Sequence, residues 1–334
     1  MFLDGSTRGK MWWVFAHGDG DGVSSAALAL AALNDARIFF SHPYGLYGDL
    51  KENVRIGDDV VIVDIALNEV HIEELVKIFS EISKKGELIY IDHHPEPLSI
   101  RVNEIPGTAI VHDTEVCAAE LTFKFFEDKL PWDYNRVALY GAISDYAMDT
   151  PFVRESLKDW DMRLIYFEAG VLSQGLEGSR KMYDFKRHVV KHLSENRLPS
   201  ALSELLIKAL IESVSEEEMI QEIKKSFRVK GNVAYILDPP GSIARAATYV
   251  RAIAKKEVGI AGETRKDKIV MSLRTSSEKI DLNKILRDLS RKIPIQGGGH
   301  RRAAGARVPI AYFEQFIDLL NEKTSKSNRE NTSD

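Results

Sequence analysis

The chain has 334 residues, enough for two domains at roughly 150 residues per domain. Hydrophobic residues make up 44% of it, which excludes a disordered chain. The formal net charge of −5 excludes a protein that coats nucleic acid through an overall positive charge. A local binding cleft remains compatible with that charge, particularly if bound metal ions reverse its sign.

Cysteine content and hydropathy narrow the class further. The single cysteine, Cys117, excludes a disulfide framework and a cysteine zinc site. The apolar run at 11–16 is too short for a secretory signal, and no stretch approaches the roughly 20 apolar residues of a membrane span. We therefore expect a cytoplasmic protein.

The N-terminal half alternates short apolar runs with helical patterns. Continuous apolar runs predict strands at 12–16, 37–40, 60–65, 88–91 and 109–111. Helical spacing predicts helices at 23–33 and 70–82, and then, from residue 116 onward, at 118–126, 137–146 and 155–172. Strands that are apolar throughout are buried on both faces, so we predict a mainly parallel sheet flanked by helices.

A second, smaller α/β pattern follows a charged helical segment at 201–226. It comprises strands at 233–237, 258–262 and 268–273, helices at 243–255, 282–290 and 310–321, and a glycine-rich loop at 297–300. We therefore divide the chain into an N-terminal domain with a helical extension (1–195), a helical connector (196–227), a C-terminal domain (228–322) and a flexible tail (323–334). The basic segment 180–188 interleaves cations with aromatic residues, which fits a track for single-stranded nucleic acid or an amphipathic helix with solvated charges.

Acidic and histidine side chains follow the predicted strands at the points where they end. We expect these residues to meet at one edge of the sheet, where parallel strands place their carboxyl ends. They are His17, Asp19 and Asp21 in one extended glycine-containing turn, Asp64, the triplet Asp92, His93 and His94, and Asp145 near the end of a helix. Taken singly, Asp64 and Asp145 are better explained as turn formers or helix caps, and Asp21 could be a cap. Together they supply ligands for two divalent cations, a pair that suits phosphoryl displacement.

The glycine-rich stretch of the second domain is a candidate anion site. Gly297, Gly298 and Gly299 would let backbone N–H groups approach a phosphate, although a flexible turn explains them as well. Arg274 ends a predicted strand, and guanidinium groups suit phosphate recognition. His300, Arg301 and Arg302 follow the glycines, and the two arginines fit a solvated surface as well as a binding site.

These motifs, in this order, resemble those of the DHH phosphoesterase superfamily. The four N-terminal motifs are the stretch from His17 to Ser25, the strand end at Asp64, the Asp92-His93-His94 triplet and the glycine-containing helix with Asp145. The stretch from Gly297 to His300, with Ala303, Ala304 and Gly305, resembles the DHH-associated C-terminal domain. Within the superfamily the chain is most similar to compact archaeal RecJ-like nucleases.

The resemblance implies two manganese ions, for which magnesium or cobalt could substitute. It implies one ion held by His17, Asp19 and Asp64, and a second held by Asp21, Asp64, His93 and Asp145. Asp92 would orient His93, and His94 would contact the scissile phosphate or help to protonate the leaving group. Arg274, the three glycines, His300 and Arg301 would hold the substrate end.

The implied activity is that of a RecJ-like exonuclease, which uses metal-activated water to hydrolyse single-stranded DNA or RNA to mononucleotides. Within the same chemistry, the alternative is a phosphodiesterase for short oligonucleotides (nanoRNA) or cyclic dinucleotides. A further alternative is a partner-binding subunit of a replication or repair complex. Expected partners are therefore a single strand or a short oligonucleotide, with a second copy of the chain or a replication or repair protein as further candidates.

Overall fold

A five-stranded sheet organises the N-terminal half of the chain. The structure is a computed structural model that describes residues 10–329, and it divides the chain into two units with the boundary between Glu212 and Ser213. The strands of the first unit are β1 (Trp12–Ala16), β2 (Arg37–Phe40), β3 (Asp59–Val63), β4 (Leu88–Asp92) and β5 (Ala109–His112). Every neighbouring pair is parallel, in the order β2-β1-β3-β4-β5. The predicted parallel sheet is confirmed, and its order reverses between β1 and β3, the kind of switch point where such sheets bind ligands.

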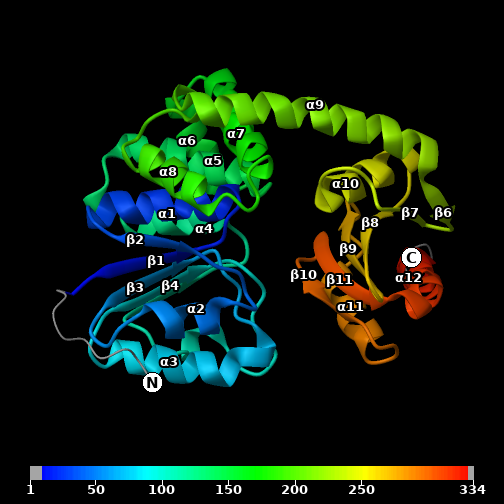
Figure 1. Cartoon of the computed structure of the whole chain (residues 1–334), viewed down its shortest axis with the longest axis horizontal. Coiled ribbons are helices and arrows are strands. Elements are labelled where there is room, and N and C mark those ends of the chain that lie inside the picture. The colour runs from blue at the N-terminus through cyan, green and yellow to red at the C-terminus, as the bar shows by residue number, and fades with distance from the viewer. Residues whose placement is uncertain (1–9, 330–334) are drawn as a thin grey trace. The chain divides into compact units, whose positions relative to one another are not determined.

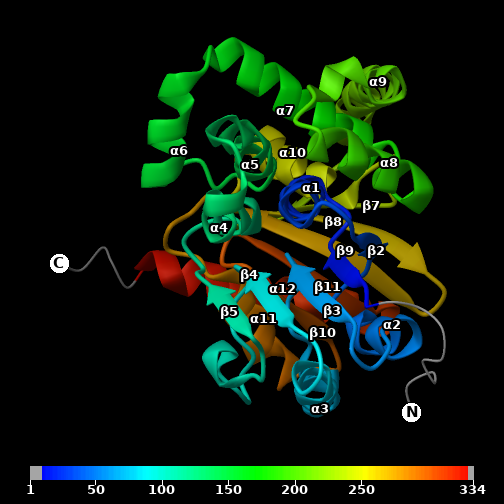
Figure 2. The same cartoon turned by 90° about the vertical axis from the view of Figure 1, so that its left-hand side faces the viewer.

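Alternating side chains of the strands separate two hydrophobic cores. Val14 and Val61 face a core that includes α1 (Gly20–Leu33) and α4 (Ala118–Phe125). Phe15 and Ile62 face the opposite core, which includes α2 (Leu46–Asn53) and α3 (Ile72–Ser83). Figures 1 and 2 show α1 and α3 on opposite faces of this sheet. The period-two alternation of a strand explains why each strand contributes to both cores.

A second layer of helices lies beyond α1 (Figure 1). It contains α5 (Asn135–Ser144), α6 (Pro151–Ser156), α7 (Met162–Glu177) and α8 (Tyr183–Ser194). The small side chains of α1, rich in alanine, allow close packing on both sides, and almost the whole helix is buried. α1 therefore lies between the sheet and the helical layer.

Several elements of the first unit differ from the predictions. The helix predicted at 155–172 is broken, because Asp161 caps a new helix by accepting from the Arg163 N–H at 2.9 Å. Helix α2 was not predicted, because its eight residues carry too little apolar periodicity. The helix predicted from Val23 begins at Gly20, since Asp19 is its N-cap, so Asp21 lies in the first helical turn and not in an extended turn.

The second unit contains a six-stranded mixed sheet. Its strands are β6 (Arg228–Lys230), β7 (Val233–Leu237), β8 (Val258–Arg265), β9 (Lys268–Thr275), β10 (Gln296–Gly299) and β11 (Ala303–Pro309). The order is β10-β11-β9-β8-β7-β6, with β7 and β8 parallel and the other pairs antiparallel. One core packs α10 (Ile243–Ala254) and the end of α9 (Ser203–Ser226) on the sheet, and the other packs α11 (Leu282–Ser290) and α12 (Phe313–Arg329). The predicted two-domain α/β class is confirmed.

Two predictions for this unit are wrong. The glycines at 297–299 form strand β10 and not a loop, because they pair with β11 in antiparallel register. The flexible tail predicted from residue 323 is helical as far as Arg329, because buried Thr324 donates to the Leu320 carbonyl and Lys323 pairs with Asp288 at 3.1 Å. Residues 330–334 lie outside the described range. No described helix is long and apolar enough to cross a bilayer.

Gly141 on α5 tests the packing of the helical layer. A Cβ at this position would lie 2.4 Å from the Ala119 Cβ, so we expect Gly141→Ala to lower the free energy of unfolding by ~1–3 kcal/mol through overpacking. Urea unfolding of the metal-free protein measures this. Gly170→Ala is the matched control, because Gly170 is exposed on α7 with open space around it and should gain up to ~1 kcal/mol from helix propensity. Equal effects of the two substitutions would contradict the packing.

Candidate metal centre

The turn between β1 and α1 carries three of the predicted ligands. Asp19 caps α1, with its Oδ1 accepting from the Gly22 N–H at 3.1 Å. The other Asp19 oxygen, Oδ2, lies 2.9 Å from His17 Nδ1. Buried Asp21 accepts from the N–H groups of Ala118 (2.9 Å) and Ala119 (2.8 Å) at the start of α4. The positive end of the α4 dipole therefore stabilises the Asp21 carboxylate.

Asp64 lies between the two groups of candidate ligands. It follows β3 with a φ of 57°, a left-handed conformation that aspartate tolerates better than most side chains. Its Oδ1 lies 3.3 Å from His93 Nε2, and its Oδ2 lies 3.8 Å from His17 Nδ1. Oδ2 is buried and has no hydrogen-bond partner in the described part of the chain. An unusual backbone conformation and an unsatisfied buried oxygen are both typical of a functional site.

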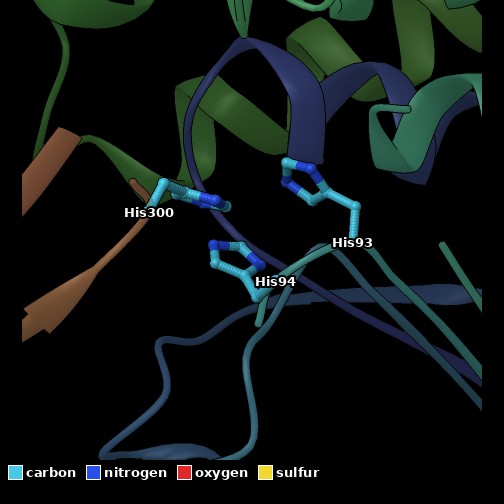
Figure 3. A group of neighbouring side chains, drawn as sticks. All are labelled: His93, His94 and His300. Atoms are coloured by element: carbon cyan, nitrogen blue, oxygen red, sulfur yellow. The ribbon is translucent and has the colours of Figure 1, made fainter. Parts of the chain in front are cut away.

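His93 follows the end of β4, and its ring lies near the end of α5. Its Nε2 lies 3.7 Å from Asp21 Oδ2, and its Nδ1 lies 3.7 Å from Asp145 Oδ2, so the buried ring faces carboxylates on both sides. Asp145 is the C-cap of α5. Figure 3 shows the rings of His93 and His94 at the end of β4, where they meet edge to face with centroids 4.7 Å apart.

Asp92 contacts His94, whereas we expected it to orient His93. Its Oδ1 lies 2.8 Å from His94 Nδ1, and its Oδ2 accepts from the Tyr90 hydroxyl at 3.0 Å. Tyr90 and Asp92 project from the same face of β4 because they are two residues apart, whereas His93 reaches across to Asp21 on α1. The two histidines, which follow the end of β4, therefore have different partners.

Sequence reasoning missed Tyr90 and His112. The Tyr90 hydroxyl oxygen also lies 2.9 Å from the Ile65 carbonyl oxygen, so its single proton is shared between that carbonyl and Asp92, which fixes the phenol beside Asp92. His112 pairs with Asp92 across β4 and β5, and its Nε2 lies 2.7 Å from the His94 carbonyl. The alternation along β4 was a usable signal for Tyr90. His112 depends on strand register, for which the sequence carried no signal.

Burial and mutual repulsion shift the pKa values of the acids. Burial, followed by the charge of Asp19, raises the pKa of Asp64 well above its ordinary value and that of Asp21 to about 7. Burial, followed by the charge of Asp21, raises the pKa of Asp145 to about 8. For Asp19, burial opposes ionisation, but the charge and hydrogen bond of His17 and the hydrogen bond from the Gly22 N–H act together with others to outweigh it and lower the pKa. The metal-free cluster therefore retains protons that a cation would displace.

The two adjacent histidines have opposite pKa shifts. Burial, together with the charge of His94, lowers the pKa of His93 to about 4. Burial also acts to lower the pKa of His94, but the charge and hydrogen bond of Asp92 outweigh it and raise the value to about 9. At neutral pH His93 is therefore neutral, as a metal ligand must be, and His94 is a cation.

The donor set fits two divalent ions. Ligand atoms of His17, Asp19 and Asp64 lie within 4.8 Å of one another, and so do those of Asp21, His93 and Asp145. Asp64 approaches both groups, and its unsatisfied Oδ2 would gain a partner. Carboxylate oxygens with some imidazole suit manganese and related ions. No ligand position that the sequence proposed lies away from this edge of the sheet.

The candidate substrate residues lie at one end of the C-terminal sheet. Register pairs Ala303 of β11 with Arg274 of β9, which places Arg274 beside the turn that contains His300. The Arg274 guanidinium donates to Ser272 Oγ and to the Leu273 carbonyl, both at 2.9 Å. Arg301 and Arg302 both contact Glu278. Gly299 has a φ of 139°, a conformation for which glycine is needed.

Two family models match the chain. The model of the DHH family, N-terminal domain, matches residues 12–147, and that of the DHHA1 domain matches residues 214–326. No curated protein sequence matches the chain.

Several solved structures share the fold. RecJ from Thermus thermophilus, in complex with Mn2+, is 17% identical with a TM-score of 0.68; the match covers 95% of this chain and 52% of RecJ. The pGpG-specific phosphodiesterase PggH from Vibrio cholerae is 15% identical with a TM-score of 0.58, and the match covers 95% and 100%. A DHH domain described as a member of a family of ribosomal proteins is 15% identical with a TM-score of 0.69, and the match covers 94% and 86%. At these identities the likeness shows a shared fold, and the chain spans about half the length of the Thermus RecJ.

Manganese should raise the unfolding temperature more at pH 8 than at pH 6. The pKa values of Asp21 and Asp145 are raised from 3.8 to about 7 and 8, so the metal-free folded state binds these two protons more tightly than the unfolded state does. This proton binding stabilises the metal-free fold fully below pH 4, and the stabilisation is lost as the pH rises through the two raised pKa values. At pH 6 their protons also compete with the metal. A tenfold weaker affinity removes about 1.4 kcal/mol of metal-dependent stabilisation, or about 3–6 °C.

Circular dichroism melts with manganese and with EDTA, at both pH values, measure this difference. Equal gains at the two pH values would show that the carboxylates are already ionised in the metal-free protein. EDTA added after manganese should restore the metal-free melting temperature and controls for irreversible effects.

Proposed function

Because the chain belongs to the DHH family of metal-dependent phosphoesterases, we propose that it is a phosphodiesterase that shortens single-stranded DNA or RNA from one end to mononucleotides. The observation that carries the proposal is the position of Asp64, whose two oxygens face the two candidate ligand groups. A shared carboxylate is what a two-ion phosphodiesterase requires.

Two divalent ions, manganese being our first choice, would stabilise charge on the reacting oxygens and lower the pKa of a bound water. His17 and Asp19 would hold one ion, and Asp21, His93 and Asp145 the other, with Asp64 shared. The α4 N-terminus keeps the Asp21 carboxylate oriented toward the site through its two backbone N–H groups. The ligands therefore need little rearrangement on binding.

His94 is the best candidate for contact with the phosphate. Asp92 holds its Nδ1 and keeps the ring protonated, so Nε2 can donate to a phosphate oxygen or to the leaving oxygen. The His112 contact with the His94 carbonyl further restricts this segment. About a quarter of the His94 side chain is exposed (24%), compared with 6% for His93, so His94 is the more accessible of the two.

In the C-terminal unit, Arg274 and the β10–β11 turn with His300 are proposed to bind the substrate end. The Arg274 guanidinium is held in place by two hydrogen bonds to its own strand, which orients a planar, permanently charged donor group. Backbone N–H groups of the glycine strand add donors without side-chain obstruction.

A phosphodiesterase for short oligonucleotides or cyclic dinucleotides is the second candidate. One observation supports it: the fold match covers the whole of the pGpG-specific enzyme.

Asp64→Asn should reduce turnover below detection while leaving the metal-free protein folded. Asparagine has nearly the same size and also tolerates the left-handed conformation, but it removes the shared charge. Steady-state hydrolysis and circular dichroism measure the two effects. Asp113→Asn is the control. Asp113 is exposed just after β5, and among the described hydrogen bonds its side chain accepts only from the nearby Glu115 N–H. The activity of this variant should stay within about twofold of that of the unmodified protein. An active Asp64→Asn enzyme would refute the two-ion site.

End-labelled single strands of DNA and RNA, the dinucleotide pGpG and cyclic di-AMP, each incubated with manganese, separate the two candidate functions. Stepwise shortening of the long strands is expected, and the position of the label gives the polarity. Cleavage of the dinucleotide alone would replace the exonuclease with the second candidate. Bound manganese without hydrolysis of any substrate would indicate a partner-binding subunit.

A further inference from the structure

A lysine is buried in the helical layer above the sheet. Lys186 on α8 is 5% exposed, and its Nζ donates to the carbonyl oxygen of Gly18, 168 residues away in the chain. Neighbouring Phe185 is also buried, so this part of the basic segment 180–188 forms an amphipathic helix and not an exposed track. Arg187, by contrast, pairs on the surface with Asp184 at 2.6 Å.

The burial of this ammonium group requires an explanation. Lysine is almost never fully buried unless it is paired, because the charge loses its hydration. Burial lowers the pKa of Lys186, and the nearby charge of Asp19 acts in the opposite direction. The lysine therefore lies within reach of the acidic cluster, and the contact with Gly18 satisfies one of its donors.

Gly18 is located between two candidate ligands. Its carbonyl belongs to the peptide that joins it to Asp19, so a fixed carbonyl direction restricts the backbone between His17 and Asp19. Glycine has little conformational preference of its own, and the turn therefore needs an external restraint. A Cβ at residue 18 would lie 3.1 Å from Lys186 Nζ and 3.7 Å from its Cδ, so the lysine occupies space that a larger residue would need.

We infer that Lys186 is a positioning residue, which fixes the turn that presents His17 and Asp19 to the first metal ion. A role of Lys186 in turnover rests on the proposed function, whereas its role in metal binding does not. The ammonium also offsets part of the negative charge of Asp19 in the metal-free protein. Outer residues that orient metal ligands typically contribute 10–100-fold to affinity or activity.

Isothermal titration of the metal-free protein with manganese tests this without substrate. Lys186→Met keeps the length of the side chain and removes the donor, and we expect one of two manganese sites to weaken by about 10–100-fold while the other is retained. Gly18→Ala crowds the same contact from the other side, because its Cβ would lie 3.1 Å from Lys186 Nζ, and should weaken the same site. The double variant should be no weaker than the single ones, because both remove one interaction.

Lys208→Met is the matched control. Lys208 on α9 lies over the Phe185 ring at 5.2 Å, contacts Met182 and pairs with Glu204, so its replacement changes packing without touching the turn. Its manganese binding should stay within about twofold.

Unchanged binding of both ions in a folded Lys186→Met protein would overturn the inference. So would equal weakening of both sites together with a lower melting temperature, which is the result expected of a merely structural lysine. If the protein hydrolyses none of the offered phosphodiesters, the proposed function fails, and the calorimetric result for Lys186 still decides the positioning role.

Discussion

Repulsion among buried carboxylates is the constraint on which the metal centre depends. Asp21, Asp64 and Asp92 are each almost fully buried, and Asp19 and Asp145 lie beside them. Charges in such surroundings interact more strongly than in water, so the cluster must retain protons or acquire positive charge. The raised pKa values of Asp21, Asp64 and Asp145 are the expression of this conflict. A cluster of this kind is unfavourable by itself and becomes favourable when divalent ions enter.

The fold meets part of that cost with fixed local partners. The N-terminus of α4 donates two hydrogen bonds to Asp21, and the cationic His94 pairs with Asp92. Lys186 brings a third positive group from α8. The first two partners contact carboxylates of the cluster, whereas Lys186 contacts the Gly18 carbonyl next to Asp19. Asp64, with its unsatisfied oxygen, lies between the two groups of ligands. Preorganised ligands of this type lose little freedom when a metal binds.

The two adjacent histidines differ because their contacts differ. His93 lies toward Asp21 and is kept neutral by burial, whereas His94 is bound to Asp92 and is kept cationic. Both residues follow the end of β4 and their rings meet edge to face, so the partner of each ring, and not its side of the strand, sets its protonation state. A metal ligand and a proton donor can thus be placed next to each other in the sequence.

Local sequence patterns were sufficient to predict the class of the fold and to propose the residues of the candidate site. Continuous apolar runs predict buried parallel strands, and polar residues that follow such runs must lie at one edge of the sheet, so Asp64 and His93 could be proposed from local pattern alone. The contacts between these side chains follow from the tertiary structure. The pairing of Asp92 with His94, the approach of His112 across β4 and β5, and the contact of Lys186 with Gly18 depend on strand register and on helix packing between distant segments. Local periodicity reports burial and direction, but it carries no information about which distant residue supplies the partner.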